Sequence, residues 1–355
     1  MRPSPRLTIV SSQQRSGILA GGNWIVDKLK LIDTYPAQDA LANILGESAG
    51  NGGSPFNVLV DLAKLGASFP LNGIGLTGND ADGEWVREVC AQHGIGTAQL
   101  HTHAGMHTSY TDVMTVKSTG RRTFFHQRGA NAFLAARHFD FSAVAAKIFH
   151  LGYLLLLDEL DKPDAHFGTV AARVLKKAQD AGLKTSVDVV SEDGNRFPKI
   201  VRPALRFSNY CFLNEMEAER TTGIPIRLAD GNASGTGLRR AAEKLLADGV
   251  QEWVIIHYPG GAFAASSGGG RVAQGSVKVP QNKIAGTTGA GDAFAAGVLL
   301  GLHEGKPMAD CLHLGVCTAA ASLSRTAASD GIKSAMHCLS LGKKYGYRPA
   351  IKFTA

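Results

Sequence analysis

Cysteine is scarce in this chain, which has only five among its 355 residues. No two of them form a C-x-x-C pair, and the count is odd. A disulfide framework or a zinc ribbon needs paired or closely spaced cysteines, so the sequence favours neither. The pattern instead predicts reduced, buried thiols and a cytoplasmic protein.

Long hydrophobic runs are also missing. The longest candidate, residues 293–302, contains glycine and is too short to cross a bilayer. Residues 1–17 lack the hydrophobic region of a signal peptide. We therefore expect no membrane partner. We also expect residues 1–17 and 341–355 to form basic tails that flank a single domain, residues 18–340.

Concentrated charge of one sign is a third absence. The formal net charge is +7, but the basic residues cluster only in pairs such as Arg121-Arg122 and Lys343-Lys344. No zinc-finger spacing accompanies these pairs. A mildly basic protein suits a small anionic ligand such as a nucleotide, and we expect no nucleic-acid partner.

The usual nucleotide-binding fingerprints are absent or incomplete. No G-x-x-x-x-G-K-[ST] loop occurs, so the sequence does not support a Walker-type NTPase. Gly73 to Gly78 matches G-x-G-x-x-G and suggests a nicotinamide-dependent oxidoreductase as an alternative. That fingerprint expects an acidic residue about twenty positions later, yet no Asp or Glu lies between Glu88 and Asp112. We therefore favour a glycine-rich connection between a strand and a helix.

Strand and helix patterns alternate from residue 148 onward. A strand over 210–213, for example, precedes a helix over 215–222 that stops at Gly223. Such repeats predict an α/β fold with a central, mostly parallel sheet and helices on both faces.

One stretch departs from this repeat. Residues 101–129 are rich in threonine, histidine and β-branched residues, and they predict a hairpin of strands 110–117 and 123–127. Together with residues 26–36 they are expected to form a small, discontinuous β lid. An exposed strand edge on such a lid would allow a homodimer contact through it.

The stretch over 285–302 carries the strongest chemical signal. Three glycines and two threonines occupy the six positions from Gly286 to Gly291, and Asp292 then opens an apolar run. A tight loop entering a buried helix presents unpaired N–H groups and the positive end of the helix dipole, which suits a phosphate. Gly289 and Gly291 allow the backbone to approach an anion closely. Asp292 is either a simple N-cap or a group that removes a proton.

This stretch resembles the second signature, D-T-x-G-A-G-D, of the ribokinase-like, or PfkB, family of carbohydrate kinases. The resemblance implies that the amides of Gly289, Ala290 and Gly291 form an anion hole for the transferred phosphoryl group. It also implies that Asp292 is the catalytic base. Gly286 stands where the family has its first Asp. Family members activated by a monovalent cation use that Asp, so the resemblance leaves potassium dependence open.

Two earlier motifs follow the order of the same family. Gly22 to Asp27 resembles G-x-x-x-x-D, and Gly52 to Asn57 resembles the first signature, G-G-x-x-x-N. The resemblance implies that Asp27, Gly52, Gly53 and Asn57 bind the substrate. A carboxylate can accept two hydroxyl hydrogen bonds, and an amide can bind a further hydroxyl. The alternatives are a solvated Asp at a strand end and an Asn N-cap.

Asn214 to Glu217 matches the family motif N-x-x-E. The resemblance assigns Asn214 to the nucleotide phosphates and both residues to Mg²⁺. This ion keeps several waters, so one Asn and one Glu are enough for it. Asn followed three residues later by Glu is also a capping box, and both interpretations can hold together.

Other positions are assigned through the same resemblance. The family has a T-L-G-type turn near the adenine, and His257-Tyr258-Pro259-Gly260 replaces it here. We therefore assign His257, Gly260 and Thr287 to the nucleotide. Arg128 precedes a G-A-N triplet that is familiar from the family, and it either reaches the substrate or faces water.

The resemblance covers about residues 18–332. It predicts an ATP-dependent kinase that phosphorylates a hydroxyl of a sugar or sugar-like molecule, with ATP and Mg²⁺ as cofactors. A nucleoside is the alternative acceptor. A non-catalytic sensor of sugars or nucleotides on the same fold is the alternative from another functional class.

Overall fold

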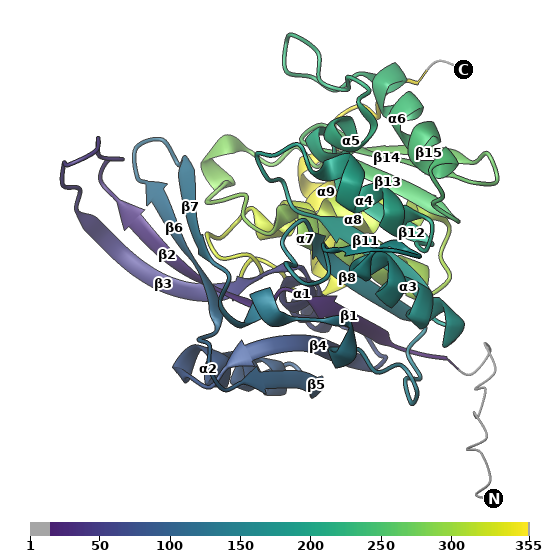
Figure 1. Cartoon of the computed structure of the whole chain (residues 1–355). Helices are drawn as coiled ribbons and strands as arrows, with labels where there is room; N and C mark the ends of the chain where they lie inside the picture. The colour runs from purple at the N-terminus through teal and green to yellow at the C-terminus, as the bar shows by residue number, and fades with distance from the viewer. Residues whose placement is uncertain (1–14, 354–355) are drawn as a thin grey trace, which may run out of the picture.

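The structure is a computed structural model, and it describes residues 15–353. Its centre is a nine-stranded sheet in the order β5-β4-β1-β8-β11-β12-β13-β14-β15 (Figure 1). Pairing is parallel from β5 to β13, and β14 and β15 extend the sheet as an antiparallel hairpin. The mostly parallel sheet predicted from the sequence is confirmed. The strands are β5 (Ile95–His103), β4 (Leu71–Gly78), β1 (Ile18–Gly22), β8 (Ile148–Leu154), β11 (Lys184–Val189), β12 (Tyr210–Asn214), β13 (Trp253–Tyr258), β14 (Gly261–Ser266) and β15 (Arg271–Gly275).

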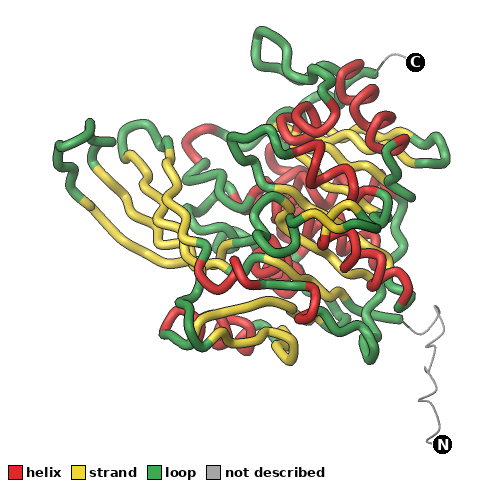
Figure 2. Tube along the Cα trace, viewed as in Figure 1, coloured by secondary structure: helices red, strands yellow, loops and turns green. Residues whose placement is uncertain are grey.

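Helices cover both faces of this sheet, as predicted (Figure 2). One face carries α1 (Ser54–Leu65), α2 (Ala81–Gln92), α7 (Ala290–His303), α8 (Met308–Ser322) and α9 (Ala335–Tyr345). The other carries α3 (Val170–Asp180), α4 (Phe197–Leu205), α5 (Glu215–Thr222) and α6 (Gly235–Ala247). Short elements complete the path: β9 (Pro163–Asp164), β10 (Gly168–Thr169) and 3₁₀ turns over Gly129–Phe133, Ala136–His138 and Gln281–Lys283. No helix within residues 15–353 is long and apolar enough to span a membrane.

Helix α7 lies at the centre of the first face, between α1 and α8. Every residue from Asp292 to Gly301 is buried, which explains the apolar run in its sequence. Small residues bring α7 and α8 close together: a Cβ built on Gly297 would lie 2.9 Å from the Cα of Gly315. This packing fixes the position of the amino end of α7.

A second sheet projects from the body of the molecule (Figure 1). Its order is β3-β2-β6-β7, and its strands are β2 (Ile25–Ile32), β3 (Ile44–Gly52), β6 (Ser109–Val116) and β7 (Arg122–Gln127). The predicted hairpin forms β6 and β7, but the lid differs from the expectation in two ways. Residues 101–103 belong to β5 and pair with β4 in the main sheet. The sequence does not predict β3, because its first six residues are all exposed and backbone pairing with β2 defines the strand.

The segments expected to be tails are partly attached to the domain. Residues 1–14 and 354–355 lie outside the described residues. Arg15 donates hydrogen bonds to two carbonyls of the segment before β8, at 2.8 and 3.2 Å. At the other end, the Tyr347 hydroxyl lies 2.9 Å from His313 Nε2 on α8. Residues 341–353 therefore pack on the body instead of forming the expected tail.

The glycines of the dinucleotide-like motif have a packing role. A Cβ on Gly73 or Gly75 would lie only 2.4 or 2.1 Å from the ring of Trp24. That indole is fully buried and donates to the carbonyl of Ile74 at 2.8 Å. Gly73 to Gly78 continue as strand β4 and make room for an aromatic ring. The structure therefore gives no support to the oxidoreductase alternative.

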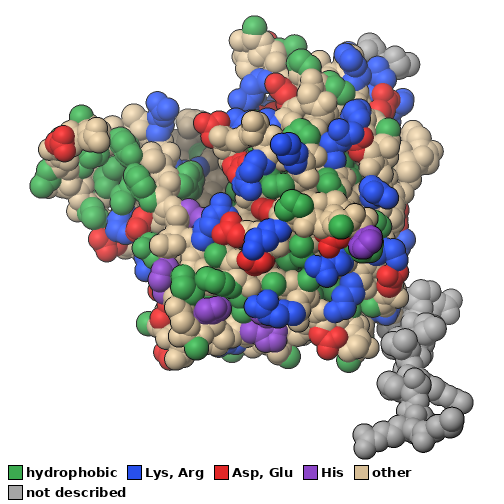
Figure 3. All heavy atoms as spheres, in the orientation of Figure 1, with side chains coloured by type: hydrophobic (Ala, Val, Ile, Leu, Met, Phe, Trp, Pro, Cys, Tyr) green, Lys and Arg blue, Asp and Glu red, His purple; other side chains and the backbone are tan. Residues whose placement is uncertain are grey.

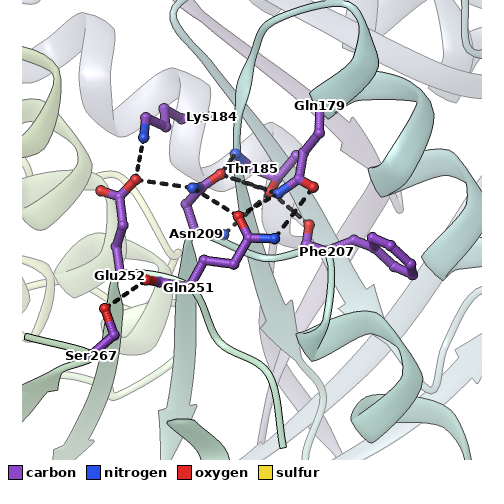
Figure 4. Close-up of polar contacts among 8 residues, drawn as sticks. All are labelled: Gln179, Lys184, Thr185, Phe207, Asn209, Gln251, Glu252 and Ser267. Carbon is purple, nitrogen blue, oxygen red and sulfur yellow. Dashed lines mark hydrogen bonds and ion pairs between the residues drawn. The ribbon is translucent and has the colours of Figure 1, made fainter.

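A polar network joins the amino ends of β11, β12 and β13 (Figure 4). Asn209 Oδ1 accepts from the Thr185 amide at 2.8 Å, and Asn209 Nδ2 donates to Glu252 at 2.9 Å. Gln179 and Gln251 extend the network by a hydrogen bond of 3.0 Å. These contacts satisfy polar groups at the amino ends of the strands. The side chains at this end of the sheet therefore have a structural role.

Candidate active site

Two adjoining cavities open at the carboxyl ends of the parallel strands, where open α/β sheets bind their ligands. One, of about 470 Å³, lies under the second sheet, and we call it the lid cavity. The other, of about 490 Å³, lies toward β13 and α8, and we call it the apolar cavity. A hollow between the projecting sheet and the body is visible in Figure 3. Both cavities are lined by Asn214, His257, Thr287, Ala290 and Gly291.

The amino end of α7 separates the two cavities. Gly289 is its N-cap and has φ of +71°, a left-handed conformation that favours glycine. The first amides of a helix have no partner within the helix, so they can bind an anion. Here the Ala290 amide makes a long contact of 3.3 Å with the carbonyl of Thr287. Asp292 is the third residue of the helix and makes no capping hydrogen bond, so the N-cap interpretation of Asp292 is wrong.

Asp292 is nearly enclosed, with an exposed fraction of 4%. Its carboxylate accepts hydrogen bonds from Asn57 Nδ2 at 2.7 Å and from the Tyr153 hydroxyl at 2.7 and 2.8 Å. Burial raises the pKa of Asp292 to about 6, and the hydrogen bonds from Asn57 and Tyr153 oppose the rise. A carboxylate with such a pKa is largely ionised near pH 7 and can still accept a proton.

Helix α1 brings Asn57 to this carboxylate. The helix begins at Ser54 with Gly53 as its N-cap, so the interpretation of Asn57 as a cap is wrong. A Cβ on Gly53 would lie 2.1 Å from the carbonyl oxygen of Asn23, so glycine is required there. Asn51 Nδ2 donates to Asn57 Oδ1 at 2.7 Å. This hydrogen bond fixes the Asn57 amide so that its NH₂ group points at Asp292.

Beneath this network, Asp61 of α1 is a buried carboxyl group with an exposed fraction of 0%. Among the described residues, neither of its oxygens has a partner with hydrogen-bond geometry. Burial raises the pKa of Asp61 well above its usual value, and Ser329 and Lys64 only partly oppose the rise. The folded protein therefore holds this group protonated at a pH where the unfolded chain ionises it.

Asp61→Asn is therefore expected to stabilise the protein by about 1–3 kcal/mol at pH 7, because the neutral amide folds without the proton uptake that the raised pKa of Asp61 imposes. Because its folded pKa is raised, Asp61 lowers stability progressively as pH rises above about 4. Urea unfolding at pH 5 and pH 8 should show a larger gain at pH 8. Asp330→Asn, at an exposed position beside Ser329, is the control. Equal stability of Asp61→Asn and the wild type at both pH values would contradict this account.

The lid cavity contains Asp27, contributed by β2. Burial raises the pKa of Asp27 to about 7, the charge of Asp292 adds to the rise, and a hydrogen bond from Thr111 opposes it. Gly52 does not line this cavity but supports it, because a Cβ there would lie 2.5 Å from Asp27 Oδ1. Asp188, at the carboxyl end of β11, adds another buried acid.

The apolar cavity has walls made largely of hydrophobic side chains. Its walls include Val279, Ile284, Phe294, Val316 and Leu323.

His257 lies where the two cavities meet. Burial lowers its pKa to about 4, so the imidazole is neutral at pH 7. Gly260 does not line the apolar cavity but borders a neighbouring one, with Tyr258 and Pro259.

Asn214 and Glu217 form the predicted capping box at the start of α5. Asn214 Oδ1 accepts from the Glu217 amide at 2.9 Å, and the Glu217 carboxylate accepts from the Asn214 amide at 2.8 Å. Ser191 also donates to Glu217, at 2.6 Å. Burial raises the pKa of Glu217 to about 7. No group of three or more His, Cys, Asp or Glu that could hold a metal ion occurs within residues 15–353.

Arg128 does not reach either cavity. It forms an ion pair with Asp158 at 2.6 Å, so the structure gives no support to its assignment to the substrate. The structure instead brings Arg122 and Tyr153 into the lid cavity, and the sequence analysis identified neither. Tyr153 lies at the carboxyl end of β8, and such positions in a parallel sheet are the one local signal that points to it.

Comparisons with known proteins place the chain in a family. A model of the pfkB family carbohydrate kinases matches residues 26–335. The chain is 26% identical over 293 residues to a ribokinase of Haemophilus influenzae. This match covers 81% of this chain and 86% of the relative. It is 28% identical over 276 residues to a fructokinase of Klebsiella pneumoniae, covering 74% and 82% of the two chains.

Solved structures show the same architecture. A ribokinase of Arabidopsis thaliana complexed with ribose and ATP matches with a TM-score of 0.72 at 21% identity, over 92% of this chain and 98% of that one. A ribokinase of Giardia lamblia matches with a TM-score of 0.75 at 18% identity, over 91% and 98%. The fold is therefore ribokinase-like, as predicted. Because the family model spans most of the sequence, this chain belongs to the pfkB family of carbohydrate kinases.

Proposed function

We propose that this protein transfers the γ-phosphoryl group of ATP to a hydroxyl of a sugar or sugar-like small molecule. One observation carries the proposal: the lid cavity and the apolar cavity meet at the amino end of α7, beside the buried carboxylate of Asp292. A donor and an acceptor bound on either side of this point would face each other across an anion-binding helix terminus.

The transfer breaks one bond and forms another. The acceptor oxygen attacks the γ-phosphorus while the bond from that phosphorus to the bridging oxygen of ADP breaks. The hydroxyl proton passes to Asp292, which acts as the general base. The amides of Gly289 and Gly291, with that of Ala290, stabilise the charge on the transferred group. The geometry supports these roles, because all four residues line the lid cavity.

The acceptor would lie in the lid cavity. Asp27 and Asn57 line it, and both side chains can bind sugar hydroxyls. Gly53 lines the same cavity, and Gly52 leaves room for the Asp27 carboxylate. A nucleoside acceptor uses the same hydroxyl chemistry and is the second candidate.

The apolar cavity fits the adenine of ATP, because its hydrophobic walls can cover a flat ring and Thr287 lines the passage toward α7. The donor set suits a Mg²⁺ ion that is held mainly by phosphates and water, since Asn214 and Glu217 already bind each other. We propose that these two residues contact the ion through water. When bound, the ion offsets phosphate charge. The predicted homodimer contact through the lid and the cytoplasmic location stay predictions.

The proposal is tested by incubating the protein with ATP, Mg²⁺ and a panel of sugars and nucleosides and measuring ADP. We expect ADP release that depends on at least one sugar. Release with a nucleoside alone would favour the second candidate. ATP binding in calorimetry without ADP release for any acceptor would instead indicate a non-catalytic sensor.

Tyr153→Phe is expected to shift the pH dependence of the reaction. The hydroxyl stabilises ionised Asp292, so its loss raises the pKa of Asp292. One hydrogen bond to a charged group corresponds to a shift of about one pH unit. The acidic limb of kcat/KM should therefore move to higher pH. Tyr345→Phe, on the distant helix α9, is the control. An unmoved limb would show that this hydrogen bond does not tune the base.

A further inference from the structure

Arg122 connects the projecting sheet to the loop before α7. Its guanidinium donates hydrogen bonds to the hydroxyls of Thr287 and Thr288, which are distant in sequence. These two threonines directly precede Gly289, the N-cap of α7. The second sheet therefore touches the loop before α7 through the side chain of Arg122, which is a cation.

The alternation of β7 explains why Arg122 has this position. Residues two apart in a strand point to the same side, and Arg122, Phe124 and His126 all line the lid cavity. The intervening residues Thr123 and Phe125 do not line it. The side chain of Arg122 is therefore directed inward by the register of the hairpin, in which it pairs with Thr115.

Arg122 is a cation in a cavity that is lined by several acidic groups. Among the described residues that line this cavity, four are acids, and Arg122 is the only lysine or arginine. Its hydrogen bonds go to neutral hydroxyls, although a guanidinium carries five donors and binds phosphate well. Burial lowers the pKa of Arg122, and the charge of Asp27 partly opposes this shift. An anion placed at the loop would satisfy the guanidinium.

The neighbours of Arg122 indicate which anion this is. Thr287 lines both cavities, so the guanidinium lies beside the passage between donor and acceptor. The buried acids Asp27 and Asp188 line the lid cavity itself, so an acceptor that carries its own negative charge would lie against two carboxyl groups. The phosphoryl group in transfer is an anion that would lie in the passage beside Arg122 and does not belong to the acceptor. It therefore fits both the place of the guanidinium and the acids of the lid cavity.

We propose that Arg122 is a catalytic residue that the lid brings to the phosphoryl group during transfer, so that the lid supplies positive charge to the transition state. This inference rests on the proposed kinase function. An arginine that reaches the transferred group stabilises the charge on its oxygens, and it acts most strongly where water is excluded. Arg122 would exchange its threonine partners for phosphoryl oxygens.

Kinetics of Arg122→Ala with ATP and the best sugar test the proposal. We expect kcat to fall by about 10²- to 10³-fold, as when one preorganised donor is removed, while the KM of the sugar changes little. Arg122→Lys should be intermediate, because an ammonium keeps the charge but loses the bidentate geometry. Arg121→Ala, at the exposed neighbouring position, is the control and should behave like the wild type. A raised sugar KM with unchanged kcat would overturn the proposal and make Arg122 an acceptor-binding residue.

A binding measurement separates this proposal from the kinase assignment. Calorimetry compares ADP alone with ADP plus aluminium fluoride, a stand-in for the transferred phosphoryl group, in the presence of Mg²⁺ and sugar. Arg122→Ala should bind ADP like the wild type. The factor by which aluminium fluoride lowers the Kd of ADP should be at least tenfold smaller in this variant than in the wild type. Equal tightening in both proteins would overturn the role of Arg122. A wild type that neither binds ADP nor releases it from ATP would instead contradict the proposed function.

Discussion

Asp292→Asn is expected to lower kcat by about 10²- to 10⁴-fold, the range that a positioned general base contributes. The amide keeps the size of the side chain and can still accept a hydrogen bond from Tyr153, which lies 2.7–2.8 Å from the carboxylate oxygens. It cannot take up a proton. The loss should therefore affect kcat, while calorimetry should show that ATP and the sugar bind nearly as before.

The control for this experiment is Asp310→Asn. Asp310 is an exposed acid in the first turn of the adjacent helix α8, as Asp292 is a buried acid in the first turn of α7. Both substitutions remove a negative charge from a helix start, so they share any loss of interaction with the helix dipole. Only the buried acid faces the lid cavity. Near-normal activity of Asp292→Asn would remove Asp292 from the role of base.

The pH profile gives a second measure of the same role. The pKa of Asp292 is raised to about 6, and a base acts only when it has lost its proton. In the wild type, kcat/KM should therefore fall as pH decreases through about 6. The residual activity of Asp292→Asn should lack this limb. If both proteins share it, another group produces the limb.

Gly289→Ala is expected to lower kcat by about 10²- to 10³-fold, as the loss of oxyanion-hole geometry does in other enzymes. An added Cβ would lie 2.4 Å from the Cβ and 2.8 Å from the Cα of Ala328. The second of these is backbone, so the loop has to move and carries the amides of Gly289 and Gly291 with it. The left-handed φ of +71° adds conformational strain. Measurement of kcat should show the effect, together with reduced thermal stability.

Gly305→Ala is the control for Gly289→Ala, because it introduces the same left-handed backbone strain without displacing a loop. Gly305 lies beyond the other end of α7 and has φ of +72°, but a Cβ there has no neighbour within 4 Å. Both substitutions should cost about 1–2 kcal/mol of stability through the left-handed backbone. Only Gly289→Ala should lose most of its kcat. If the two variants lose stability alike and both keep kcat, the loop at Gly289 does not form the anion hole.

Local signals in the sequence predicted several elements well. The helix over 215–222 and its stop at Gly223 are found as predicted, because a capping box begins the helix and a left-handed glycine ends it. The family motifs identified Asn57 and Asp292, and the fold places them 2.7 Å apart although 235 positions separate them. Nothing local to either residue points to the other, so this contact comes from the tertiary structure alone.

Other features depend on contacts that no single segment contains. Strand β3 has no amphipathic alternation, and it is a strand because β2 pairs with its backbone. Arg122 is the first residue of β7 and lines the lid cavity, whereas Arg128 lies just after β7, where the chain turns into the 3₁₀ turn over Gly129–Phe133. The sequence analysis left open whether Arg128 reaches the substrate or faces water, and in the structure Arg128 pairs with Asp158.

The order of the residues in 286–292 was sufficient to specify a glycine loop, a helix start and one acid, because backbone freedom and helix termini are properties of neighbouring positions. The pKa of that acid was not specified there. Its raised pKa arises from burial, and its hydrogen-bond partners come from α1 and from the end of β8. Burial and hydrogen bonding depend on segments that are distant in sequence. The pKa of Asp292 is therefore set only when folding brings these segments together around it.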